Sequence, residues 1–293
     1  MLQRTNGQKV FAVFNTIGLV LLSIIFILPV WHVAMGSISD PLKVSATSGL
    51  ILTPLGEPTM GGYKLVMQNN SILVSYLNTF IYVLGSTSIG LVLNLLAAYV
   101  LSRKNLMFKG IIVFIVMFTM IFNGGLIPTY ILVRNLGMLD TRWAIILPGC
   151  VTAYNIIIMR TSFSQIPDEL YEAARIDGAG NFRILWQIVV PVSKAIIAVI
   201  VLFYAIQQWN AWFNASIYLT KRELFPLQLT LREIVLLSSE NSIVAEADGQ
   251  DVEIYRPLIK YATIMVSVIP MMVIYPFIQK YFVTGVMIGS VKG

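Results

Sequence analysis

Six stretches of this chain are long and apolar enough to cross a lipid bilayer as helices. A spanning helix needs about 20 mostly apolar residues, because the hydrocarbon core is about 30 Å thick. The stretches lie at residues 10–31, 74–101, 111–133, 143–159, 188–206 and 261–282. The fourth is short, and Pro148 and Gly149 interrupt it. The pattern predicts an all-α, polytopic membrane protein with six transmembrane helices in a single domain, residues 1–293.

The composition excludes a water-soluble fold. Of the 293 residues, 57% are hydrophobic and only 12% are charged. Soluble domains carry about 25% charged residues and about 45–50% apolar ones. The first stretch is too long for the apolar part of a signal peptide, so we expect it to be retained as an anchor.

The chain has one cysteine, Cys150, and one histidine, His32. These counts exclude a disulfide framework and any metal site built from several Cys or His residues. They also disfavour a membrane-embedded enzyme, which would need a clustered nucleophile and base or a metal set. We interpret Cys150 as a small buried hydrophobe and His32 as an interfacial residue, and assign neither a role.

The distribution of charge predicts the orientation in the membrane. With the N-terminus inside, the cytoplasmic segments 1–9, 102–110, 160–187 and 280–293, together with Lys194, hold eleven Lys/Arg and four Asp/Glu. The longer outer segments hold nine Lys/Arg and ten Asp/Glu. Because basic residues concentrate in cytoplasmic loops, we expect both termini to be cytoplasmic. The scatter of the basic residues, despite a net charge of +6, argues against nucleic-acid binding.

A long segment, residues 207–260, is expected as an outer loop. Its middle, Ser238–Glu253, is acidic and has no Lys or Arg. Loops of this length are usually functional or disordered. Two interpretations stay open: a solvated loop, or a docking element for an outside partner.

The inner segment 160–187 predicts a helix, a glycine break and a second helix. Pro167 suits a first helical position, where its missing N–H costs nothing. Asp168 and Glu169 then lie in the first turn, where the helix dipole favours anions. Glu172 and Arg175 are spaced to pair.

The second half of this segment contains the break. Gly178 and Gly180 are expected to end the helix in unusual backbone geometry, and Asn181 to cap the next helix, which contains Pro191. A short amphipathic helix of this kind is suited to a groove of another protein. Contact with lipid headgroups alone is the other interpretation.

The same segment resembles a known family. Glu172-Ala-Ala, Gly178 and Ile188-x-Val-Pro191 are similar to the EAA signature of binding-protein-dependent ABC importers, with Val190 where the pattern prefers leucine. In that family the EAA loop is the coupling helix that docks on the ATP-binding subunit. The resemblance implies the ABC importer permease fold, and it implies that this contact is carried by Glu172, Ala173, Ala174, Asp177 and Gly178.

Other segments are similar to the carbohydrate branch of the family, in particular to permeases for complex or acidic oligosaccharides such as pectin fragments or alginate. They are Asn123-Gly-Gly-Leu-Ile-Pro-Thr-Tyr130, Trp209-Asn-Ala-Trp-Phe-Asn214 and the ending from Tyr275 to Gly293. In maltose-type importers the last outer loop of the corresponding subunit reaches into the sugar-binding protein. The resemblance extends this role to Gln207–Lys260.

The resemblance implies a set of partners. They are a second homologous permease subunit, two ATP-binding subunits, an external solute-binding protein, an oligosaccharide substrate and membrane lipid. No Gly-Lys dipeptide occurs, so the chain lacks a phosphate-binding loop of the Gly-x-x-x-x-Gly-Lys type. We therefore expect no cofactor on this chain, with ATP and Mg²⁺ bound by the partner ATPase subunits, and localisation in a bacterial inner membrane.

Polar and aromatic side chains in or beside the spans are candidates for the substrate path. Such residues are costly in lipid unless they face the bundle interior or water. Interhelical hydrogen bonds for the amides and interfacial anchoring for Trp and Tyr remain alternatives. The candidates are Asn94, Tyr99, Asn123, Tyr130, Tyr154, Asn155, Trp209, Asn210, Trp212 and Asn214.

A self-sufficient secondary transporter of a small solute is the alternative function. It would require intramembrane carboxylates and inverted repeats. The predicted spans hold almost no acidic residues, which favours the importer subunit.

Overall fold

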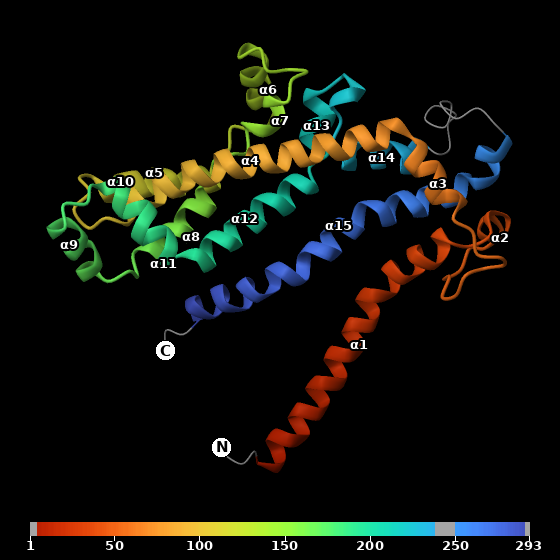
Figure 1. Ribbon diagram of the computed structural model, residues 1–293, viewed down its shortest axis with the longest axis horizontal. Coiled ribbons are helices and arrows are strands. Elements are labelled where there is room, and N and C mark those ends of the chain that lie inside the picture. Colours follow the sequence, from red (N-terminus) through yellow and green to blue (C-terminus); the bar gives the residue numbers. More distant parts are fainter. Residues whose placement is uncertain (1–4, 238–249, 291–293) are drawn as a thin grey trace. The chain divides into compact units, whose positions relative to one another are not determined.

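The computed structural model describes residues 5–237 and 250–290, and all regular secondary structure in that part of the chain is helical (Figure 1). The helices are α1 (Asn6–Ser37), α2 (Pro41–Ala46), α3 (Gly61–Gln68), α4 (Asn70–Ser102), α5 (Lys109–Ile121), α6 (Leu126–Asn135), α7 (Trp143–Ile146), α8 (Ala153–Phe163), α9 (Asp168–Ile176), α10 (Asn181–Ile184), the π-helix η1 (Leu185–Val189), α11 (Val190–Val192), α12 (Lys194–Trp209), α13 (Phe213–Tyr218), the 3₁₀ turn η2 (Arg222–Leu224), α14 (Leu227–Leu237) and α15 (Gln250–Ser290).

Three helices are long and apolar enough to span a membrane without a break. They are α1, α4 and the Ile254–Pro276 part of α15. Two pairs of helices pass the same test only together and are bent at a short break: α5 and α6 by 108°, and Asn181–Val192 and α12 by 87°. The described residues thus contain between three and five candidate spans, and the predicted count of six is not confirmed.

The predicted stretch 143–159 is two short helices, α7 and α8, separated by residues 147–152. Pro148 and Gly149 lie in this break, as the sequence indicated, because proline lacks the N–H that a continuing helix needs. Pro191 has a similar effect later in the chain, where a π-helix precedes it and the helix stops at Ser193.

The chain divides into two compact units, residues 1–70 with 231–270 and residues 71–230 with 271–293. In the first unit a small core forms around Val44, Ile51 and Leu258. His32 binds the segment after α1, because its Nδ1 accepts a hydrogen bond from the Ile51 N–H at 2.9 Å.

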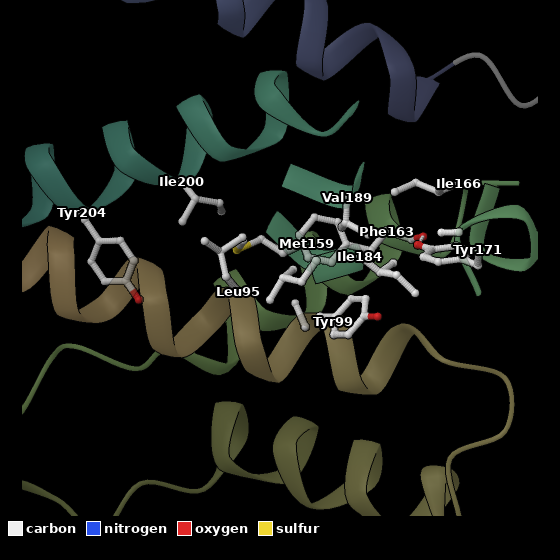
Figure 2. Close-up of a cluster of buried hydrophobic side chains, with 13 residues drawn as sticks. Leu95, Tyr99, Met159, Phe163, Ile166, Tyr171, Ile184, Val189, Ile200 and Tyr204 are labelled. Carbon is white, nitrogen blue, oxygen red and sulfur yellow. Dashed lines mark hydrogen bonds between the residues drawn. The ribbon is translucent and has the colours of Figure 1, made fainter. Parts of the chain in front are cut away.

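Among the described residues of the second unit, two hydrophobic clusters include residues of α4. The α13 cluster consists of Tyr82, Val133, Ala144, Ile145, Ile146, Cys150, Ala215, Tyr218, Leu219, Phe225 and Leu229. The α9 cluster consists of Leu95, Ala98, Tyr99, Met159, Phe163, Ile166, Tyr171, Ala174, Ile184, Leu185, Val189, Ile200 and Tyr204 (Figure 2). Cys150 is buried, as predicted.

The first half of α4 carries a buried polar stripe, Ser75, Asn78, Thr79 and Tyr82, at helical spacing. These side chains bind the chain near η2 and α14. Asn78 Nδ2 donates to the Glu223 carbonyl at 2.7 Å, and the Tyr82 hydroxyl donates to the Leu224 carbonyl at 2.6 Å.

The segment 207–260, expected as a loop, is therefore structured over much of its length. It contains α13, η2, α14 and the beginning of α15. Side chains of α4 satisfy backbone groups of this segment that no helix satisfies, which holds it in place. Residues 238–249, most of the acidic stretch Ser238–Glu253, lie outside the described residues.

In the second half of α4, Asn94 connects three elements. Its amide nitrogen donates to the Gly90 carbonyl at 2.6 Å and to the Tyr204 hydroxyl of α12 at 2.5 Å. The Tyr204 hydroxyl in turn donates to the Cys150 carbonyl, in the break before α8, at 2.6 Å. A carbonyl freed by the break is thus satisfied inside the protein, as hydrocarbon surroundings require.

A second polar clamp joins Asp140 to the end of α13. Asp140 has a left-handed backbone, φ 56°, and its carboxylate accepts hydrogen bonds from the Thr220 hydroxyl at 2.7 Å and from the backbone N–H groups of Thr220 and Lys221. The Thr220 N–H and hydroxyl are the main groups that hold the pKa of Asp140 below its usual 3.8.

Gly90 should not tolerate a side chain, because a Cβ there would lie 2.6 Å from the Cys150 carbonyl oxygen. We expect Gly90→Ala to destabilise the protein by about 1–3 kcal/mol, as overpacking does. Gly85→Ala is the matched control, since its Cβ would meet the flexible tip of Ile146 at 2.9 Å. Thermal unfolding of the solubilised transporter measures both, and equal midpoints would contradict this account of Gly90.

The Asp140 clamp should weaken in acid. Because its folded-state pKa is depressed, the clamp is fully stabilising above pH 3.8 and is lost as the pH falls through the folded value. Hydrogen exchange of the Thr220 and Lys221 amides should accelerate, relative to intrinsic rates, as the pH falls below about 4. Asp140→Asn, which tolerates the same backbone and does not titrate, should abolish this dependence. A variant with the wild-type pH profile would disprove the role of the carboxylate.

Candidate functional site

Helix α9 is amphipathic and is anchored by one face. Tyr171 and Ala174 are buried in the α9 cluster, together with residues of α4, α8 and η1. Figure 2 shows Tyr171 at one end of this cluster and Tyr204 at the other. Glu172 and Ala173, between the two anchors, are exposed. The helix is thus fixed to its own chain and presents its opposite face outward.

The start of α9 follows the prediction with one shift. Pro167 is the residue before the first helical position, and Asp168 and Glu169 occupy the first turn. Asp168 forms an ion pair with Lys104, just beyond the end of α4. Within the described part of the chain, the expected ion pair between Glu172 and Arg175 is not formed, so this prediction is wrong. Both side chains are exposed, and water screens the attraction between them.

The end of α9 is a Schellman motif. The N–H of Gly178 donates to the Arg175 carbonyl at 3.0 Å, and the N–H of Ala179 donates to the Ala174 carbonyl at 2.9 Å. Gly178 has φ +76°, a conformation that glycine adopts without the cost that a Cβ brings. The predicted unusual backbone is therefore confirmed at Gly178.

The next two expectations are wrong. Gly180 has φ −70° and an extended backbone, which any residue can adopt. It is also the residue that precedes α10, so Asn181 is the first helical residue and makes no capping bond through its side chain. The single left-handed residue at Gly178 already reverses the chain, and no second one is required.

The residues that the resemblance associates with ATPase coupling fall into two groups. Glu172, Ala173, Asp177 and Gly178 are exposed, whereas Ala174 is only 7% exposed and faces the α9 cluster. Two apolar side chains of the same helix are also exposed, Leu170 at 42% and Ile176 at 86%. Exposed apolar side chains among polar ones are a feature of protein-binding surfaces.

α9 and the chain around α13 and η2 lie near opposite ends of α4. Lys104 pairs with Asp168 beyond one end, and Asn78 binds the Glu223 carbonyl near the other. The helical rise places about 36 Å between Asn78 and Ser102, slightly more than the thickness of the hydrocarbon core. In Figure 1, α9 lies at the C-terminal end of α4.

The candidates for the substrate path lie in different surroundings. Asn94, Tyr99, Asn155 and Trp209 are buried. Asn94 serves the interhelical network with Tyr204, and Tyr99 belongs to the α9 cluster. Trp209 packs edge-on against Phe80, with ring centres 5.6 Å apart.

The remaining candidates are at least partly accessible. Tyr130 and Trp212 both pack on the α13 cluster, and the Tyr130 ring stacks on Tyr218 at 6.3 Å. The other four, which are exposed, are Asn123, Tyr154, Asn210 and Asn214. Asn123 has a local role, since its Oδ1 accepts the Gly125 N–H at 2.9 Å in the bend between α5 and α6.

Two groups of residues were missed from the sequence. The polar stripe of α4 could have been found from its spacing, since Ser75, Asn78, Thr79 and Tyr82 lie on one helical face. The contact of Arg103 with the Tyr171 ring of α9 joins residues far apart in the chain, and no local pattern indicates it.

The comparisons with known proteins agree with this architecture. The family described as binding-protein-dependent transport system inner membrane component matches residues 70–288. The polygalacturonan/rhamnogalacturonan transport system permease protein YtcP of Bacillus subtilis (strain 168) is 39% identical over 94% of this chain and 96% of its own length. Protein LplC of the same organism is 36% identical over 100% of this chain and 98% of its own length.

A solved structure is also similar. It is a chain of a bacterial ABC transporter involved in the import of the acidic polysaccharide alginate, with a TM-score of 0.86 and 30% sequence identity. The match covers 96% of this chain and 100% of the other. This chain therefore belongs to the family of inner membrane components of binding-protein-dependent transport systems.

Proposed function

We propose that this chain is the membrane-spanning permease subunit of an ATP-driven oligosaccharide importer, that it forms half of the translocation pathway, and that α9 is its coupling helix. The observation that carries the proposal is the surface of α9. It combines exposed Glu172, Ala173 and Gly178 with exposed apolar Ile176, on a helix anchored from behind by Tyr171.

The placement of α9 supports its contact with a cytoplasmic partner. It lies about 36 Å along α4 from the region of α13, so the two regions suit opposite faces of a bilayer. Segments 102–110 and 160–187 together hold six Lys/Arg and four Asp/Glu, which favours the cytoplasm for the α9 end. Both termini are then cytoplasmic, and α13 and α14 lie outside, where an external solute-binding protein would dock.

The partners complete the proposed machine. A second permease subunit supplies the other half of the pathway, and two ATP-binding subunits hold ATP and Mg²⁺. Closure of the ATPase pair on ATP moves the coupling helices, and the permease pair switches from inward-facing to outward-facing as rigid bodies.

The relatives support the class of substrate. One is a permease for polygalacturonan and rhamnogalacturonan, and the solved transporter imports alginate. Both sets of polymers contain acidic sugars, so we propose that this importer carries complex, acidic oligosaccharides.

Replacing Gly178 with phenylalanine should uncouple ATP hydrolysis from transport. A side chain at φ +76° costs about 1–2 kcal/mol of backbone strain, and its ring would occupy the surface proposed to meet the ATPase. We expect uptake into proteoliposomes by the complete transporter to fall by about tenfold, in the range of typical coupling energies.

Gly180→Ala is the matched control for this variant. Gly180 lies two residues away and has φ −70°, and a Cβ at this position would have no atom within 4 Å, so wild-type uptake is expected. Normal uptake by Gly178→Phe would refute the coupling role of α9. Gradient-driven uptake by the purified chain alone would instead favour a secondary transporter.

Acidic oligosaccharides should compete for uptake. The assay is entry of a labelled galacturonate oligomer into proteoliposomes that contain the whole transporter and its binding protein. An unlabelled uronate oligomer should inhibit this entry, whereas a neutral maltodextrin of equal length should not. Inhibition by the neutral sugar alone would refute the proposed substrate class.

A further inference from the structure

Where α4 ends, the guanidinium of Arg103 contacts two tyrosine rings from different helices. Its Cζ lies 4.7 Å from the ring centre of Tyr99, one turn earlier on α4, and 3.5 Å from the ring centre of Tyr171 on α9. Both tyrosines are 6% exposed, so these contacts are largely shielded from water. A cation over an aromatic face is attracted more strongly when both are desolvated.

The rings hold this guanidinium more than hydrogen bonds do. Its Nη2 donates to the Tyr99 hydroxyl at 3.4 Å, which is long, and its buried Nε has no hydrogen-bond partner within the described residues. A flat guanidinium stacks on rings in a way that the ammonium of lysine does not reproduce. The chemistry of the contact is therefore specific to arginine and an aromatic ring.

A second link lies one residue further along the chain. Lys104 pairs with Asp168 of α9, although their side chains are 76% and 49% exposed, so water weakens this pair. The end of α4 is itself fixed, because Lys109 Nζ donates to the Arg103 carbonyl at 2.8 Å and Arg160 Nε donates to the Leu101 carbonyl at 3.2 Å.

The backbone connects α9 to its neighbouring helices less firmly than these side-chain contacts connect it to the end of α4. The links to α8 and α10 are the short non-helical segments 164–167 and 177–180, which do not continue a rigid helix. A force applied to α9 therefore reaches α4 through contacts between side chains. Of the two cation–ring contacts of Arg103, the contact with Tyr171 of α9 is the shorter, 3.5 Å against 4.7 Å for Tyr99.

We infer that Arg103 is a positioning residue that locks α9 to the end of α4, so that displacement of the coupling helix moves α4 as one body with it. This inference rests on the proposed function, in which α9 docks on an ATPase. It adds the route by which the movement enters the spans.

The first test uses the complete transporter in proteoliposomes and measures ATP hydrolysed per sugar imported. Arg103→Met and Tyr171→Leu should each raise this ratio by about five- to tenfold, as mutations along a coupling route do. Tyr171→Phe keeps the ring and should behave as wild type. The Arg103→Met, Tyr171→Leu double variant should be no worse than either single one, since both remove the same contact.

Arg134→Met is the matched control, because Arg134 is an exposed arginine in the last turn of α6. It should leave the ratio unchanged. Arg103→Lys separates charge from stacking. It should be uncoupled like Arg103→Met, because an ammonium keeps the charge but does not stack on the ring. Wild-type ratios in both Arg103→Met and Tyr171→Leu would overturn the inference.

The second test does not depend on disrupting the contact. Spin labels at the exposed positions Asn105 and Glu169 report the distance between the end of α4 and α9 in the assembled transporter. This distance should stay constant between the nucleotide-free and ATP-bound states. A change of more than about 5 Å, one helical turn, would overturn the inference even if Arg103→Met fails to assemble.

The Gly178→Phe variant distinguishes the two possible failures. If it uncouples transport while the Arg103 and Tyr171 variants do not, the lock is wrong and the coupling helix stands. If it transports sugar normally, the proposed function of α9 itself fails.

Discussion

In hydrocarbon, a backbone N–H or C=O that no helix satisfies must find a partner inside the protein, because lipid offers none. This chain breaks its helices repeatedly, at residues 122–125, 147–152 and 193, and each break frees such groups. The long helix α4 runs past much of this irregular chain. Asn78 and Tyr82 satisfy carbonyls near η2, and Asn94 acts with Tyr204 at the Cys150 carbonyl. The architecture of the second unit depends on these buried hydrogen bonds.

The same helix relates the two regions proposed to meet partners. Its first half holds the chain around α13 and η2, and the residues just after its C-terminal end, Arg103 and Lys104, contact α9. α4 is one unbroken helix of 33 residues, so it joins the two regions without an intervening break. A continuous helix between the two proposed docking regions suits a rigid-body switch between two states.

Features set by a few neighbouring residues were predictable. The first turn of α9 with Asp168 and Glu169, the left-handed Gly178 and the break at Pro148 and Gly149 all follow from local backbone chemistry. The predictions of a Glu172–Arg175 ion pair and of a capping role for Asn181 were wrong. Spacing permits such contacts, but at an exposed site they are hardly more favourable than contacts with water. The sequence analysis grouped Ala174 with Ala173, but Ala174 is turned inward, because it lies three residues after the buried Tyr171 on the same face of the helix.

The sequence by itself determined that the protein lies in a lipid bilayer, that it is helical and to which family it belongs. Long apolar runs and a short motif are properties of contiguous residues. Only the tertiary structure decided that the segment after α12 is folded against α4, that the candidates Asn94 and Tyr130 serve separate parts of the unit, and that Arg103 meets Tyr171. These outcomes join residues far apart in the chain. They depend on which buried polar groups and rings find one another once the helices pack, and no local pattern encodes that choice.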